Sequence, residues 1–252
     1  MTFALETKEL TIRFGGHTAV DAVSCGFAPG SLTAIVGPNG AGKTTYFNLI
    51  SGQLKATAGR VLLHGEDISG NSAAQRSRRG IGRAFQLTNL FPNLSVLENI
   101  RLAVQSRAGL GLNLWSIWNN HHELIGRAEE VLETVALTAK RDLAAAALPH
   151  GDQRKLEVGI LMALEPDVFM FDEPTAGMSV DEVPVILDLI RALKARRDKT
   201  ILLVEHKMDV VRELADRIIV LHNGALVADG DPATVIASPI VQEAYLGVEV
   251  AK

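Results

Sequence analysis

One glycine-rich stretch, residues 37–45, has the residue types and spacing of a phosphate-binding loop. It fits the pattern G-x-x-x-x-G-K-[ST] at every fixed position. The glycines let the backbone curl so that several N–H groups point at phosphate oxygens, and a helix after the loop adds the positive end of its dipole. Lys43 is then expected to reach the β- and γ-phosphates, and Thr44 to ligate Mg²⁺. The predicted loop residues are Gly37, Pro38, Asn39, Gly40, Ala41, Gly42, Lys43, Thr44 and Thr45.

Two carboxylates, Asp172 and Glu173, directly follow the apolar residues 168–171. If this apolar run is a strand beside the one that leads into the loop, both carboxylates emerge next to the phosphates. A carboxylate there can hold Mg²⁺, and a second one can orient or deprotonate the water that attacks the γ-phosphate. We assign the metal role to Asp172 and the base role to Glu173. An acidic pair at a strand end is often only a solvated turn, so the phosphate loop is what makes this pair informative.

Two further polar residues close apolar runs. His206 follows residues 200–204 and is expected at the same sheet edge, where open α/β folds bind ligands and where it can contact the γ-phosphate. Gln86 ends a predicted strand over 81–86, and its amide can touch both Mg²⁺ and water. Without the other motifs, the histidine would be interpreted as a residue bonded to backbone, and a lone glutamine would carry no meaning.

The elements that must position these residues alternate between strand and helix patterns. Residues 31–36 predict the strand before the loop, and helical spacing resumes at residue 45. Residues 3–28 predict an antiparallel pair of strands with a turn at 14–17. Almost all of 95–147 is predicted to be helical, with a capping-box pattern at Ser95 and Glu98 and an amphipathic helix over 123–137. Other predicted elements are a strand at 59–65, a helix at 73–79 and buried parallel strands at 168–171, 200–204 and 218–221.

The composition narrows the class of protein. The 252 residues carry a net charge of −4, which gives no basic excess of the kind that favours nucleic acid as a partner. The single cysteine, Cys25, excludes an intramolecular disulfide framework and a cysteine-based metal cluster. We expect no export signal, because the first residues lack a basic head followed by an apolar stretch. No window holds eighteen consecutive apolar residues, so no membrane-spanning segment is expected.

Taken in order, these motifs resemble the ATP-binding subunit of an ABC transporter, and the resemblance covers essentially the whole chain. It implies an α/β P-loop NTPase core with a mostly parallel sheet, an antiparallel β lead-in subdomain and an inserted α-helical subdomain. The implied single domain, 1–252, has its RecA-like core and β subdomain in 1–94 and 165–252 and its helical subdomain in 95–164. The resemblance implies ATP and Mg²⁺ as cofactors, Phe14 as the adenine-stacking aromatic, and Gln86, Glu173 and His206 as catalytic residues.

The family signature L-S-G-G-Q corresponds to residues 148–152, where the match is degraded. In the family this segment reaches the γ-phosphate bound by a second subunit, so Gly151 is expected to act in trans in a homo- or heterodimer. Pro149 removes a hydroxyl and an N–H donor, and Asp152 adds an acid where phosphate is expected. Ser179 also stands where the D-loop commonly has aspartate. Both departures affect the geometry of the partner's site.

Within the family, the chain is most similar to the ATP-binding subunits of importers for branched-chain amino acids or for urea and other amides. The long segment 105–137, the run 173–177 and the C-terminal residues 242–247 carry this similarity. It implies transmembrane permease partners and a place on the cytoplasmic face of the inner membrane. Trp115 and Trp118 either brace a partner or anchor their own subdomain. A soluble ABC ATPase not coupled to transport and a catalytically weak regulatory subunit stay open as alternatives.

Overall fold

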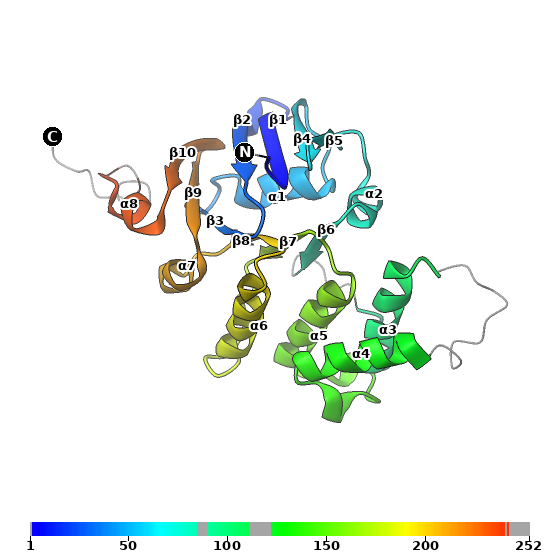
Figure 1. Cartoon of the computed structure of the whole chain (residues 1–252). Helices are drawn as coiled ribbons and strands as arrows, with labels where there is room; N and C mark the ends of the chain where they lie inside the picture. The colour runs from blue at the N-terminus through cyan, green and yellow to red at the C-terminus, as the bar shows by residue number, and fades with distance from the viewer. Residues whose placement is uncertain (1, 85–89, 111–121, 240, 242–252) are drawn as a thin grey trace. The chain divides into compact units, whose positions relative to one another are not determined.

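The computed structural model describes residues 2–84, 90–110, 122–239 and 241, and the chain is drawn in Figure 1. It divides into two compact units. The first is formed from residues 1–81, 167–173 and 193–252, and the second from residues 82–166 and 174–192. Phosphate-loop and signature residues therefore lie in different units.

The first unit begins with an antiparallel sheet of four strands in the order β2-β1-β4-β5. Its strands are β1 (Leu5–Phe14), β2 (His17–Phe27), β4 (Ala58–Leu63) and β5 (Glu66–Asp67). The turn between β1 and β2 contains Gly15 at φ +58°, a left-handed conformation that glycine adopts without steric cost. Apolar side chains of β1 and β2, including Leu5 and Phe27, are buried in the same core cluster as Tyr46 and Phe47, which follow the phosphate loop.

The second sheet has the strand order β10-β9-β3-β8-β7-β6. Its strands are β3 (Leu32–Val36), β6 (Ile81–Ala84), β7 (Val168–Asp172), β8 (Thr200–Val204), β9 (Arg217–His222) and β10 (Ala225–Gly230). β3 pairs in parallel with β8 and β9, and β8 pairs in parallel with β7, whereas β10 is antiparallel to β9. Every residue of β3, β7 and β8 is buried, as expected for parallel strands covered on both faces. The carboxyl ends of β3, β7 and β8 therefore share one sheet edge.

The helices that lie wholly within the described residues of the first unit are α1 (Lys43–Ser51), α2 (Ala73–Arg78), α7 (Met208–Leu214) and α8 (Pro232–Ala237). The buried Arg76 on α2 donates from Nη1 to the carbonyls of Leu49 and Ile50, 2.7 Å away in each case, near the end of α1. A cation at a helix C-terminus satisfies carbonyls that lack intrahelical partners. Arg76 thus fixes the far end of the helix that starts at the phosphate loop.

The second unit is mainly helical. It contains α3 (Val96–Arg107), α4 (His122–Thr134), α5 (His150–Ala163) and most of α6 (Val183–Ala195), together with single 3-10 turns at Thr138–Lys140 and Ala145–Ala147. The Ser95 hydroxyl accepts from the Glu98 N–H and caps α3, but the Glu98 carboxylate bonds Arg101 within the same helix. Gly159 on α5 allows a close approach, because a β-carbon there would lie 3.2 Å from Ile100 Cδ1.

The predicted fold class is confirmed, and several predicted boundaries change. The amphipathic helix stops at Thr134 instead of residue 137. The described part of the strand predicted over 81–86 is β6, Ile81–Ala84, and the remainder, with Gln86, lies outside the described residues. β5 and β10 were not predicted. Residues 82–84, 90–94 and 174–192 group with the helices of the second unit, and the predicted division into core and helical subdomain stays a prediction. Residues 90–94 group with the second unit because their backbone pairs with it: the N–H groups of Ala145 and Ala146 donate to the carbonyls of Leu94 and Pro92.

Candidate functional site

The loop between β3 and α1 has the curled backbone that the sequence predicts. Gly37, Gly40 and Gly42 have φ angles of +154°, +80° and +96°. A β-carbon at Gly42 would lie 2.4 Å from the Ala19 carbonyl oxygen, so this position has no room for a side chain. Gly42 is the N-cap residue of α1 and provides no side-chain cap. The first N–H groups of α1 are therefore not capped by an N-cap side chain, which leaves the start of this helix suited to bind an anion.

Lys43 is folded back over its own loop. Its Nζ donates to the carbonyl oxygens of Gly37 and Pro38 at 2.7 and 3.0 Å, and the residue is only 6% exposed. Burial lowers the pKa of Lys43, while the nearby charges of Glu173 and Asp172 oppose that shift by favouring the ammonium form. A cation held by neutral carbonyls beside two carboxylates is available to a more strongly charged acceptor such as a phosphate.

The ends of β7 and β8 bring the proposed base and the histidine together. Asp172 and Val204 are register partners, and the Glu173 N–H donates to the Val204 carbonyl at 2.9 Å. Glu173 adopts φ +52°, which costs a non-glycine residue about 1 kcal/mol and turns its side chain out of the strand. His206 Nε2 lies 2.8 Å from Glu173 Oε1. The two side chains are 37% and 39% exposed, so both are accessible to water.

A residue that the sequence analysis did not select, Glu205, fixes the position of His206. Glu205 is 3% exposed, and its Oε1 accepts from the backbone N–H groups of His206 and Lys207 at 2.9 and 3.2 Å. An acidic residue between an apolar strand and a histidine is the only sequence signal for this role. The carboxylate acts here as a cap for the turn that follows β8.

A pocket of about 260 Å³ lies in the first unit. It brings together most of the phosphate loop with Glu173 and His206, and adds His17 and Ala19, which the sequence analysis did not select. The lining residues are His17, Ala19, Asn39, Gly40, Ala41, Gly42, Lys43, Thr44, Thr45, Glu173 and His206. Phe14, at the same β1–β2 turn as His17, is 50% exposed and is not among the described lining residues.

The chemistry of this pocket fits a nucleotide with its metal ion. Its floor combines the N-terminus of α1, a lysine cation and the exposed Thr44, which is the donor set for a polyphosphate. Asp172 is 7% exposed at the end of β7 and contributes to the field at Lys43. A hydroxyl and carboxylates are hard oxygen ligands of the kind that Mg²⁺ prefers. The remaining predicted ligand, Gln86, is not described.

The signature segment starts α5 in the second unit. Pro149 is the N-cap residue and Gly151 lies in the first turn. The Asp152 carboxylate, expected as an added acid near the partner's phosphate, is bonded by both Lys140 and Lys155. Burial alone would raise the pKa of Asp152, but the hydrogen bonds from the two lysines outweigh burial and lower it. The acid that lies against Gly151 is instead Glu182, which the sequence analysis did not select: a β-carbon at Gly151 would be 1.9 Å from Glu182 Oε1.

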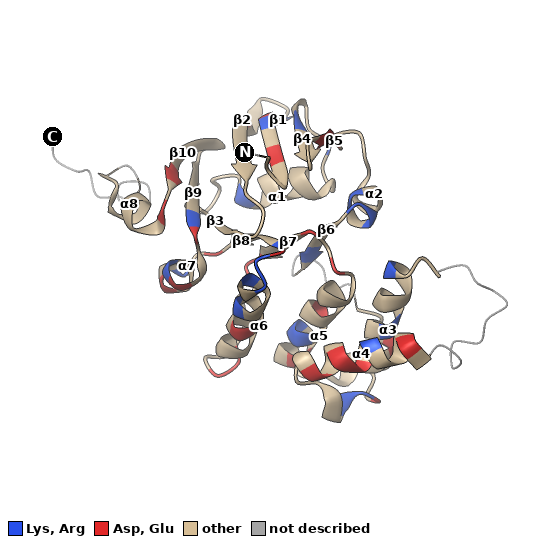
Figure 2. Ribbon diagram, viewed as in Figure 1, with Lys and Arg blue, Asp and Glu red and all other residues tan. Residues whose placement is uncertain are grey.

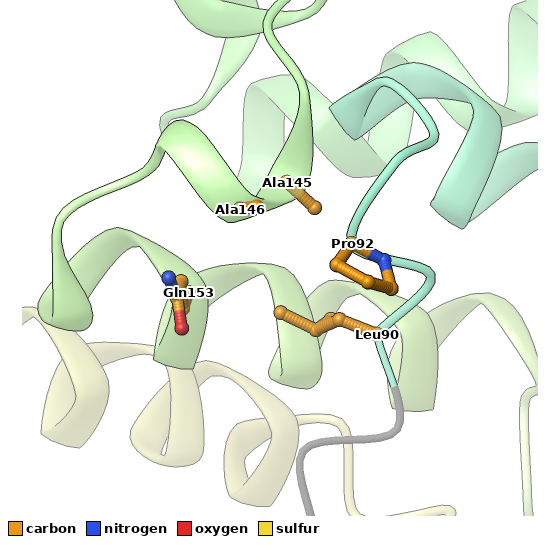
Figure 3. A pocket seen from close by; sticks show the side chains of 5 residues that line it. All are labelled: Leu90, Pro92, Ala145, Ala146 and Gln153. Carbon is orange, nitrogen blue, oxygen red and sulfur yellow. The ribbon is translucent and has the colours of Figure 1, made fainter.

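A second pocket, of about 300 Å³, lies in the helical unit (Figure 3). It is lined by Leu90 and Pro92 ahead of α3, by Ala145 and Ala146 of the 3-10 turn, and by Gln153 of α5. Three large apolar residues of the same segments are exposed: Phe91, Leu94 and Leu143. Apolar groups gathered at a pocket in this way are typical of a surface that contacts another protein.

Comparison with known families and relatives is consistent along the chain. The family described as "ABC transporter" matches residues 20–176, and "Branched-chain amino acid ATP-binding cassette transporter" matches residues 225–251. The Escherichia coli K12 protein named "High-affinity branched-chain amino acid transport ATP-binding protein LivG" is 37% identical over 248 residues, covering 96% of this chain and 97% of that relative. Within the described residues, no helix is long and apolar enough to cross a membrane.

Comparison with solved structures points to the same family. The ADP conformation of MJ1267, an ATP-binding cassette of an ABC transporter, has a TM-score of 0.83 and 31% identity, covering 98% of this chain and all of that one. A dimeric post-hydrolysis state of the ATP-binding cassette MJ0796, bound to ADP and Pi, has a TM-score of 0.77 and 26% identity, covering 90% of this chain and 98% of that one. The fold and the family are therefore shared over nearly the full length.

Proposed function

The chain belongs to the ABC transporter family of ATP-binding proteins, and we propose that it hydrolyses ATP to drive import of a branched-chain amino acid. The observation that carries this proposal is the single pocket in which the phosphate loop, Glu173 and His206 meet. The name of the Escherichia coli relative, a branched-chain amino acid transport protein, supports this solute class, and a related small amide is the alternative solute. Helices α3, α4, α5, α6 and α7 each carry both basic and acidic residues (Figure 2), so none of these five presents a purely basic face of the kind that favours nucleic acid.

In the proposed reaction, ATP enters with its phosphates against the loop. Lys43 leaves the carbonyls of Gly37 and Pro38 for the β- and γ-phosphates, because a phosphate oxygen is a stronger acceptor than a neutral carbonyl. Glu173 accepts a proton from the attacking water. His206 is already within hydrogen-bond distance of that carboxylate, so it orients Glu173 and is near the γ-phosphate as charge develops.

The proposed Mg²⁺ ligands are the Thr44 hydroxyl, Asp172 and Gln86. When bound, the ion would neutralise charge on the β- and γ-phosphates. Phe14 is proposed to stack on the adenine from the β1–β2 turn, which also carries the pocket residue His17.

A complete site is proposed to need a second ATP-binding subunit, either another copy of this chain or a related one. The dimeric cassette bound to ADP and Pi supports this arrangement for a relative. In the present chain, Gly151 in the first turn of α5 is the proposed contact to the γ-phosphate held by the partner.

The membrane partners are proposed to be permease subunits, with this chain at the cytoplasmic face of the inner membrane. The pocket in the helical unit and its exposed neighbours Phe91, Leu94 and Leu143 form the proposed docking surface. Leu143→Asp places a charge on that surface and should uncouple ATP hydrolysis from the membrane subunits while leaving nucleotide binding unchanged.

The test is ATP hydrolysis and solute uptake in vesicles that contain the co-purified permease. We expect solute-stimulated hydrolysis and uptake of leucine, isoleucine or valine only when the chain and ATP are present. Hydrolysis without any co-purifying permease would favour the soluble ATPase, and nucleotide binding without hydrolysis in the full complex would favour the regulatory subunit. Uptake of a small amide with no branched-chain amino acid would overturn the proposed solute.

A further inference from the structure

The segment 176–182, which contains the D-loop position Ser179, contacts the signature segment, residues 148–152, within the second unit. Besides the contact between Glu182 and Gly151, a β-carbon at Gly177 would lie 3.8 Å from His150 Cε1. These are the two segments in which the sequence departs from the family pattern. Their contacts place a carboxylate at the start of α5, where the proposed function requires a phosphate.

The Glu182 carboxylate is held in place from its other side. Glu182 Oε2 accepts from the backbone N–H and from the hydroxyl of Ser179, each at 3.0 Å. These two hydrogen bonds lower the pKa of Glu182, so the side chain is anionic at neutral pH. Ser179, which replaces the common aspartate, is therefore the donor that orients an anion toward Gly151.

Of the two carboxylates Glu182 and Asp152, Glu182 is the one that lies at Gly151. The neighbouring acid Asp152 is bonded by Lys140 and Lys155 and is directed to those lysines. His150, in the first turn of α5, favours the charged form of Glu182, and Asp152 opposes it. The first N–H groups of a helix attract any nearby anion, whether it is a side chain or a ligand.

We propose that Glu182 is an internal competitor for the signature segment, a carboxylate that must leave Gly151 before the γ-phosphate of a partner's ATP can bind there. This inference rests on the proposed two-subunit site and adds a regulation to it. Two anions close together at the start of α5 repel each other, and Glu182 Oε1 already lies 1.9 Å from where a β-carbon of residue 151 would be. Closure of the two subunits is therefore slower or weaker until Glu182, together with Ser179, moves away from Gly151.

The experiment measures ATP-driven association of the full chain in a Glu173→Gln background, by light scattering during an ATP titration. Glu182→Gln keeps the size of the side chain and an acceptor for Ser179 but removes the charge. It should lower the ATP concentration at half-maximal association about tenfold, the effect of removing one close like charge. Asp181→Asn is the matched control, since it removes a charge from an exposed neighbour, and it should change nothing.

Ser179→Ala provides a second variant that does not disturb the core, because Ser179 is exposed. It removes one of the two donors that hold Glu182 and should shift association in the same direction by a smaller factor. If the parent associates and both variants match it, or associate more weakly, Glu182 is only a cap and this inference alone fails. If neither the parent nor any variant associates with ATP, the proposed two-subunit site fails together with the inference.

Discussion

The two anion-facing regions of the chain, the pocket around Lys43 and the start of α5 at Gly151, differ in what occupies them. At the pocket, the loop backbone presents N–H groups, and Lys43 is held only by neutral carbonyls that a phosphate can replace. At α5, a carboxylate of the same unit already lies against the glycine. The groups of the pocket are therefore available to a ligand, whereas the start of α5 is in contact with a side chain of its own unit.

The difference follows from how the regions are built. The pocket is made by the phosphate loop, residues of β2 and the segments that follow β7 and β8. Strand register aligns Asp172 with Val204, backbone pairing holds Glu173, and the buried Glu205 caps the turn at His206. The start of α5 depends on side chains of a neighbouring turn, Ser179 and Glu182, which can rotate away. Nucleotide binding is thus expected to be a property of one chain, and closure of the composite site to be the regulated step.

The largest effect is expected from Lys43→Ala, which removes the cation of the pocket. ATP affinity should fall by about 100-fold or more, since at least one charge-assisted hydrogen bond to a phosphate is lost and buried carbonyls lose their donor. Isothermal titration with ATP measures this loss directly. Unchanged affinity and turnover would show that Lys43 is not part of the nucleotide site, and the contrast drawn between the pocket and the start of α5 would be wrong.

His206→Ala should reduce turnover by about 10- to 100-fold with little change in ATP affinity, because the contact with Glu173 supports a step after binding. The Glu205 cap does not depend on the imidazole, so the turn after β8 should keep its structure. The measurement is steady-state hydrolysis beside equilibrium binding. Equal losses of binding and rate would instead make His206 a ground-state ligand.

Pro149→Ser tests whether the signature segment needs a hydroxyl. If the new hydroxyl reaches the partner's phosphate, ATP-driven association of the Glu173→Gln chain should tighten by about 1–3 kcal/mol. Because Pro149 is the N-cap of α5, the hydroxyl can instead cap its own helix. That would raise the free energy of unfolding by about 1 kcal/mol and leave association unchanged.

Gly151→Asp is the control for that experiment. It should block association, since its side chain would collide with Glu182 and add a second carboxylate at the start of α5. Normal association of this variant would exclude Gly151 from the composite site.

The smallest effect is expected from Asp152→Asn. The pKa of Asp152 is lowered in the folded chain, so its ion pairs stabilise the fold above the pKa of the unfolded aspartate and are lost as the pH falls through the folded value. The substitution should cost about 1–2 kcal/mol at pH 7 and almost nothing in strong acid. Urea unfolding at both pH values checks this, and an equal cost at both would show that packing, not charge, is lost.

Sequence reasoning was sufficient where a residue's position follows from the backbone. Glycine spacing predicted the loop, and apolar runs predicted β3, β7 and β8 with polar residues at their ends. It failed where long-range side-chain contacts decide. Asp152 was expected to add an acid near the phosphate, and its pairing with Lys140, 12 residues away along the chain, was not predicted. The contact of Glu182 with Gly151 spans 31 positions and leaves no local pattern.

ATP hydrolysis by this chain is proposed to require Glu173 as the base, and Glu173→Gln tests that role. The chain is mixed with ATP, separated from free nucleotide, and the bound nucleotide is identified. The amide keeps the shape but not the basicity, so the account predicts retained, intact ATP and hydrolysis slower by about 10²- to 10⁴-fold. Hydrolysis at the parental rate, with ADP recovered from the variant as from the parent, would contradict it.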